Sequence, residues 1–267
     1  MTFRGTAATI AAVIIIFTIA DSVLYRLLGE NARLIYRGSV RVSWMAVVMV
    51  ATAAVAARFR WWGDYIGRVW SLLFVEYLCL TVSETIRRFV PSPSPIATPI
   101  GRGAVVIGNL AGIAAFWLLA RSLHAAGLHY AGTRSTKLAF FAIGAVLAAV
   151  LVLEPSIHEI QRLLAGTGEV DRAVSVLADL VTFILVAPLL LTALSFRGGR
   201  LFGVYALLTA GTIGWMINQG ASTVLTFLGM AGATRAGQMF GFAMACACIA
   251  GAAYVQWKGA ASEVVHA

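Results

Sequence analysis

Long apolar runs separated by short polar segments make up most of the chain. A helix needs about 20 consecutive apolar residues to cross a hydrocarbon layer ~30 Å thick, and several of the runs reach or approach that length. Arginines gather at the ends of the runs, where they anchor helices at the level of the lipid headgroups. The pattern predicts an all-α, polytopic transmembrane helix bundle that forms a single integral membrane domain over residues 1–267. It has about eight spans, near residues 7–28, 42–57, 66–88, 103–123, 138–153, 173–196, 201–228 and 237–257.

The segments between the runs support this division. Residues 91–99 contain four prolines, which cannot continue a helix, so we expect an extended connector between the third and fourth spans. The segment after the fifth span begins with Glu154 and Pro155 and is the most acidic stretch of the chain. Within it, residues 157–164 are predicted to form a short helix at the membrane surface.

Eight spans place both ends of the chain on one side of the membrane. The arginines around spans five to eight predict that this side is cytoplasmic and that the protein lies in a cell membrane, the plasma or inner membrane. Arg33, Arg37 and Arg41 fall on the other side in this arrangement, so Lys and Arg counted over all loops show no clear bias. The first run, which follows Arg4, is also compatible with a cleavable signal peptide, but its apolar pattern resumes after Asp21 and favours a retained helix.

Composition agrees with a membrane protein. The chain is 60% hydrophobic and only 12% charged, whereas soluble domains carry about 25% charged residues. The net charge of +9 would suggest nucleic-acid binding in a soluble protein, but here the arginines flank membrane spans, so the expected partner is the lipid bilayer and no nucleic acid.

The sequence lacks the residue patterns that several kinds of metal, cofactor and catalytic site require. The three cysteines lie in apolar runs without a CxxC motif, so neither a disulfide framework nor a metal site is predicted. All four histidines lie in loops or the tail, which disfavours a haem held between helices. We therefore expect no cofactor, and without a GxSxG or HExxH motif we expect no enzymatic activity.

Glu76 and Asp179 are carboxylates deep in predicted spans. A charge at the centre of the bilayer costs roughly 2.5–3.5 kcal/mol on insertion scales, and Glu76 has no basic residue within four positions while Asp179 has its nearest, Arg172, two turns away. Their partners must come from other helices or from water. Such acids are candidates for a proton relay, a cation site or a substrate contact; the alternative is a hydrogen-bonded acid that holds helices together.

Two further acids have basic neighbours in sequence. Glu84 precedes Arg87 and Arg88 by three and four residues, which predicts a local ion pair on one helix face. Asp21, a third candidate pathway residue, is followed four and five residues later by Tyr25 and Arg26, so we expect Arg26 to reach back toward it.

A polar break interrupts the seventh span. Asn218 and Gln219 lie between Gly214 and Gly220, and broken membrane helices use their freed backbone groups to bind ions or substrates. The alternative is close helix packing with Asn218 hydrogen-bonded across an interface. Asn109 in the fourth span allows the same two interpretations.

Small-residue patterns predict close helix contacts. Gly108 and Gly112 form one GxxxG pattern, and Gly237 and Gly241 form another. These allow helix backbones to approach closely, either within the chain or with a second copy or a partner membrane protein.

Two functions remain open on this basis. The first is a small transporter or channel for an ion or small solute, with a pathway formed by the intramembrane polar residues Glu76, Asp179, Asp21, Asn218, Gln219 and Asn109. The second is a non-catalytic membrane sensor, receptor-like module or assembly subunit of a larger complex. The first predicts that the carboxylates converge on one cavity.

Overall fold

The computed structural model describes residues 3–91, 93–130, 132–199, 201–230 and 233–264, and within these ranges all regular structure is helical. An all-α helix bundle is thus confirmed. The elements are α1 Phe3–Leu27, α2 Glu30–Arg58, the short 3-10 turn η1 Trp61–Gly63, α3 Tyr65–Phe89, α4 Ala97–Ala125, α5 Arg134–Ala148, the π-helical turn η2 Ala149–Leu153, α6 Glu154–Leu164, α7 Val170–Ser195, α8 Phe202–Phe227 and α9 Thr234–Val264.

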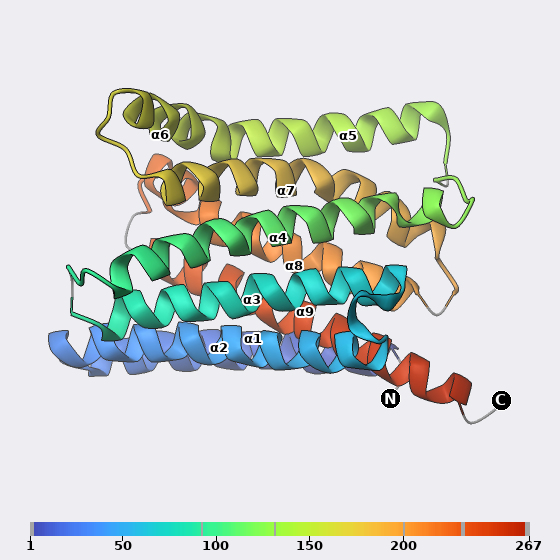
Figure 1. The fold of residues 1–267 in the computed structure, drawn as a ribbon, viewed down its shortest axis with the longest axis horizontal. Helices are drawn as coiled ribbons and strands as arrows, with labels where there is room; N and C mark the ends of the chain where they lie inside the picture. Colours follow the sequence, from blue (N-terminus) through green and yellow to red (C-terminus); the bar gives the residue numbers. More distant parts are fainter. Residues whose placement is uncertain (1–2, 92, 131, 200, 231–232, 265–267) are drawn as a thin grey trace.

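The long helices lie side by side along one axis and alternate in direction (Figure 1). Short loops join them, so chain neighbours are antiparallel, and α1 begins at the same end of the bundle at which α9 terminates. We call this end, which carries η1 and the α4–α5 and α7–α8 loops, the tyrosine end. The opposite end carries α6 and the α1–α2, α3–α4 and α8–α9 connections, and we call it the acidic end.

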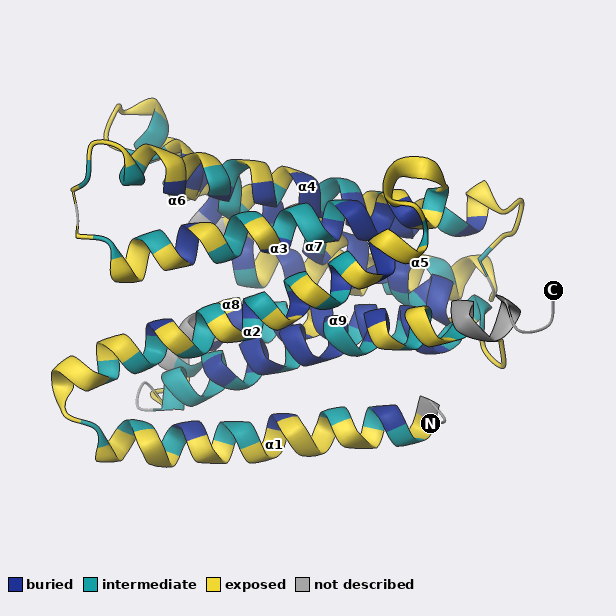
Figure 2. Cartoon of the chain, turned by 60° about the horizontal axis from the view of Figure 1, so that its bottom comes forward, coloured by how far each residue is buried: buried dark blue, intermediate teal, exposed yellow. Residues whose placement is uncertain are grey.

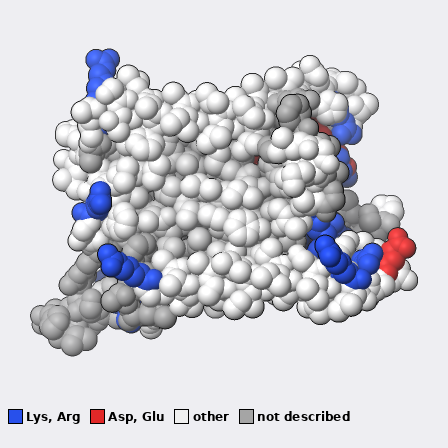
Figure 3. Space-filling view, turned by 180° about the vertical axis from the view of Figure 1, so that it is seen from behind, with Lys and Arg blue, Asp and Glu red and all other residues white. Residues whose placement is uncertain are grey.

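The bundle has the dimensions and surface of a membrane domain. Seven described helices are long and apolar enough to cross a bilayer: α1, α2, α3, α4, α5 with η2, α7 and α9. The eighth long helix, α8, carries the polar pair Asn218 and Gln219. Seen from behind, the surface shows an uncharged middle with Lys and Arg side chains gathered toward both ends (Figure 3). This distribution matches an apolar belt between two headgroup layers.

Two helices have bounds that differ from those predicted from the sequence. Helix α2 begins at Glu30, well before the predicted span at residue 42, so Arg33, Arg37 and Arg41 lie on a helix rather than in a loop. Helix α5 continues through η2 directly into α6. Pro155 lies in the first turn of α6, directly after the π-helical turn η2.

Glycines allow the closest helix contacts in the core. A Cβ on Gly241 of α9 would lie 2.4 Å from the backbone nitrogen of Asn218 on α8, and one on Gly214 would lie 2.5 Å from the nitrogen of Ala245. Gly108 of α4 approaches α3 in the same way, since its Cβ would lie 3.0 Å from the Cys79 Cβ. The glycine patterns are therefore engaged in packing within the chain.

Burial is uneven across the bundle (Figure 2). Helix α9 contributes many fully buried side chains, including Phe242, Cys246 and Ile249, whereas α1 exposes Ile15, Ile16 and most of its other apolar residues. Helix α1 packs mainly against α9. The rest of its surface is of the composition that lipid covers.

Candidate functional site

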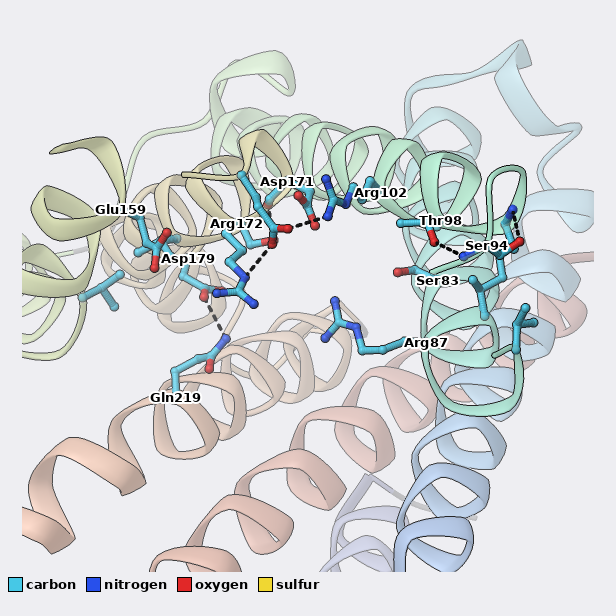
Figure 4. A pocket seen from close by; sticks show the side chains of 18 of the residues that line it. Ser83, Arg87, Ser94, Thr98, Arg102, Glu159, Asp171, Arg172, Asp179 and Gln219 are labelled. Atoms are coloured by element: carbon cyan, nitrogen blue, oxygen red, sulfur yellow. Dashed lines mark hydrogen bonds and ion pairs between the residues drawn. The ribbon is translucent and has the colours of Figure 1, made fainter. Parts of the chain in front are cut away.

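A cavity of about 690 Å³ opens at the acidic end, between α3, α4, α7 and α8, with α6 and η2 along one side (Figure 4). Its size falls within the usual range for small-molecule sites, ~300–1,000 Å³. The lining mixes apolar side chains with charges of both signs. Its polar members are Ser83, Arg87, Ser94, Thr98, Arg102, Glu159, Glu169, Asp171, Arg172, Ser175, Asp179 and Gln219.

Asp179 and Gln219 form the deep end of the charged lining. The Gln219 side-chain amide donates a hydrogen bond of 2.8 Å to Asp179 Oδ2, which joins α7 to α8. Asp179 lies nine residues after the start of α7, or ~13 Å at helical rise, so it is well inside the hydrocarbon layer. The amide leaves the other acceptor positions of the carboxylate available to a ligand or water.

Glu76 lies beside this pair on α3, near the middle of its helix. It interacts electrostatically with Asp179, although it does not itself line the cavity. Its carboxylate fits against the bare backbone of Gly112, where a Cβ would lie only 2.6 Å from Oε1. Its Oε2 is buried and has no hydrogen-bond partner among the described residues. A buried acceptor without a donor is costly, so protonation would stabilise this oxygen.

Asn109 connects the helices that carry these acids. Its amide nitrogen donates to the Val105 carbonyl oxygen of α4 at 2.8 Å and to the Ser175 hydroxyl of α7 at 3.1 Å. Ser175 lies one turn before Asp179 and lines the cavity. Asn109 thus fixes α4 against α7 next to the acidic pair.

Ion pairs line the mouth of the cavity. Glu169 accepts from Arg102 of α4 and from Arg172 of α7, the latter at 3.0 Å, and so joins the two helices. Arg87 of α3 points into the cavity from the other side (Figure 4). Among the described residues Arg87 has no ion pair or hydrogen bond. Asp171 is 8% exposed, and its Oδ1 has no hydrogen-bond partner in the described part of the chain.

The tyrosine end of the bundle is held differently. Tyr205 donates to the Ser122 hydroxyl at 2.7 Å, Tyr65 to the Leu118 carbonyl oxygen and Tyr130 to the Ala120 carbonyl oxygen at 2.7 Å. Burial raises the pKa of the Tyr130 hydroxyl in the α4–α5 loop, which keeps it a donor. These contacts join α3, α8 and the α4–α5 loop to the last turns of α4, so this end is packed where the other is hollow.

The structure places two candidate residues away from the cavity. Asp21 is 1% exposed and forms a two-pronged ion pair with Arg235 of α9, at 2.9 and 3.2 Å. The expected partner Arg26 is not the one observed, because α9 brings a cation to α1 from the far end of the chain. Asn218 is buried at the α8–α9 crossing beside Gly241, one residue from Gln219 but on another face of α8.

Sequence reasoning did not select Arg87, Arg102 or Glu169 as site residues. The local pair predicted for Glu84 is confirmed with Arg88, at 3.0 Å, and Glu84 also pairs with Arg41 of α2 at 3.4 Å, whereas Arg87 points into the cavity. The sequence signal was the pair of adjacent arginines, of which one is enough to pair with Glu84. No group of three or more His, Cys, Asp or Glu side chains that could hold a metal ion occurs among the described residues.

Fold and surface together define a multi-pass integral membrane protein with a polar cavity that enters the bundle from one side. Comparisons of the chain with models of protein families, with curated proteins and with solved structures gave no match.

Proposed function

We propose that this protein is a small transporter or channel, and that the cavity at the acidic end is one half of its pathway. The observation that carries the proposal is the pair of Asp179 and Gln219, from two different helices, at the inner end of a cavity open to one side, with the buried Glu76 of a third helix close behind it. Intramembrane acids that face a cavity are typical of ion and proton pathways.

The contrast between the two ends supports transport by alternating access. The solute site would be reached from the acidic end while the hydrogen-bonded tyrosines close the other end, and a second state would reverse this. Glu76 would exchange a proton with Asp179, with which it interacts electrostatically, because its buried Oε2 has no donor among the described residues.

A proton-flux assay tests this mechanism. Purified protein is reconstituted into liposomes loaded with a pH-sensitive dye, a pH gradient is imposed, and its decay is compared with that in empty liposomes. Wild-type protein should accelerate the decay, and Asp179→Asn and Glu76→Gln should each slow it by about tenfold or more, as expected for loss of a proton-transfer group.

The matched control is Glu30→Gln, which removes a carboxylate from an exposed position at the start of α2. It should behave as wild type. Equal flux in wild type, Asp179→Asn and Glu76→Gln would eliminate the mechanism proposed here.

A receptor-like role is the second candidate, and the closed tyrosine end is the observation that favours it. A cavity with one opening binds without conducting. Ligand binding in the absence of any flux would select this function over transport.

A further inference from the structure

The charges in the cavity identify the class of solute that it takes. Arg102 and Arg172 already share Glu169, and Glu159 already pairs with Arg162 at 3.2 Å. Two charged groups remain that can bind a ligand. They are Arg87, which has no partner among the described residues, and Asp179, which accepts from one donor. They carry opposite charges and lie on opposite sides of the cavity (Figure 4).

We propose that the cavity binds a small dipolar solute, with an oxyanion held by Arg87 and an ammonium group held by Asp179 and Gln219. A guanidinium binds a carboxylate or phosphate through two parallel hydrogen bonds. A carboxylate deep in the bundle, away from any basic side chain of its own helix, selects a cationic donor at its end of the ligand. The apolar walls formed by Leu151, Val152 and Val176 accommodate a short hydrocarbon linker.

The remaining lining supports a ligand of mixed charge over a simple ion. An inorganic anion would be repelled by those carboxylate oxygens of Glu159 and Asp171 that have no hydrogen-bond partner among the described residues. An inorganic cation would be repelled by Arg87. A dipolar molecule avoids both repulsions if it lies with its anionic end toward Arg87. Ethanolamine phospholipid headgroups and free amino acids share this chemistry, because both combine an oxyanion with an ammonium group.

This inference rests on the proposed function for its choice of cavity, but it is tested by binding alone. Full-length protein in phosphatidylcholine nanodiscs is titrated by calorimetry with ω-amino carboxylates from glycine to 6-aminohexanoate. Alkyl carboxylates and alkylamines of matching length are the single-charge controls. One chain length should bind about tenfold or more tightly than either control, since each charged hydrogen bond contributes roughly tenfold or more.

Variants separate the two ends of the ligand. In Arg87→Gln the best amino carboxylate should bind no better than the alkylamine, and in Asp179→Asn no better than the alkyl carboxylate. Arg134→Gln removes an exposed arginine at the tyrosine end and should leave every affinity unchanged. Single-charge probes that bind as tightly as dipolar ones, or an unchanged profile in Arg87→Gln, would overturn the proposal.

The same titration in nanodiscs that contain phosphatidylethanolamine distinguishes the two sources of ligand. If the lipid headgroup is the natural occupant, the apparent affinity for the soluble probe falls, and phosphatidylethanolamine co-purifies with wild type but not with Arg87→Gln. If a free solute is the occupant, the affinity is unchanged. Absence of both probe binding and lipid retention would contradict the inference, whereas binding without proton flux would contradict only the proposed function.

Discussion

The acidic end and the tyrosine end of the bundle are held together by different interactions. Six ion pairs lie toward the acidic end: Arg41–Glu84, Arg88–Glu84, Arg102–Glu169, Arg162–Glu159, Arg172–Glu169 and Arg235–Asp21. The tyrosine end has hydroxyls bonded to α4.

This difference affects how each end of the bundle can move. Ion pairs with alternative partners can be exchanged during a movement, and Glu84 and Glu169 each contact two arginines. A tyrosine hydroxyl bonded to a backbone carbonyl has a fixed partner. The ion pairs of the acidic end can thus exchange partners, whereas the tyrosine hydroxyls that are bonded to backbone carbonyls keep theirs.

The largest expected effect is at the buried pair of Asp21 and Arg235. Asp21→Ala leaves Arg235 without its partner and should lower the free energy of unfolding by about 3–5 kcal/mol, as for other buried ion pairs broken on one side. Arg235 also lies over the Tyr25 ring at 3.3 Å, so the loss should loosen α1 from α9. The measurement is SDS titration of the purified protein, with the exposed Glu30→Ala as control. A cost below about 1 kcal/mol would show that this pair does not hold α1 in place.

A smaller loss, about 2 kcal/mol, is expected for Glu84→Gln, since hydrogen bonds to charged groups contribute roughly 1.5–3 kcal/mol. Glu84 is 7% exposed and lies between Arg41 and Arg88. Arg41 also packs over the Phe242 ring of α9, 4.4 Å from its centroid. A double-mutant cycle with Arg41→Gln should show coupling between the two positions. Strict additivity would mean that the pair seen here contributes nothing.

Tyr205→Phe probes the tyrosine end and should cost about 1 kcal/mol, because one neutral hydrogen bond is lost and the Ser122 hydroxyl loses its donor. The loss should be the same at low and high salt, unlike that of an exposed ion pair. Tyr254→Phe, at an exposed position of α9, is the matched control. A salt-dependent cost at Tyr205 would contradict the division between the two ends.

The smallest effect is expected at the rim of the cavity. Arg172 and Glu169 are both substantially exposed, and exposed pairs contribute about 0–1 kcal/mol. Arg172→Gln should therefore change the unfolding free energy by less than about 0.5 kcal/mol, and the change should vanish in 1 M salt. A large, salt-independent loss would place Arg172 among the structural pairs rather than at a mobile rim.

Much of the helical architecture could be predicted because apolar length alone specifies a membrane helix. The prediction that was wrong, the start of α2, also has a physical reason. Arg33, Arg37 and Arg41 interrupt the apolar run and so suggested a loop, yet α2 extends through them because Arg41 finds Glu84 on α3 and Phe242 on α9. A partner on another helix is invisible to a pattern that is read along one segment.

The candidate site shows the same limit. Glu76 and Asp179 could be selected because neither has a cation on its own helix, and that reasoning also selected Gln219 and Asn109. Asp21 was selected as well, but its cation, Arg235, is more than two hundred residues away in sequence. Arg87 was missed because adjacent arginines look equivalent in sequence, although on a helix they point about 100° apart.

The pairing of α1 with α9 has a consequence for biosynthesis. Helix α1 leaves the ribosome before α9, its main neighbour, has been made. Until then the Asp21 carboxylate lies in the bilayer without the guanidinium of Arg235 beside it. Membrane insertion of this chain must therefore tolerate an unmatched acid near one end of α1, and α9 can dock onto α1 only after the seven intervening α-helices have been made.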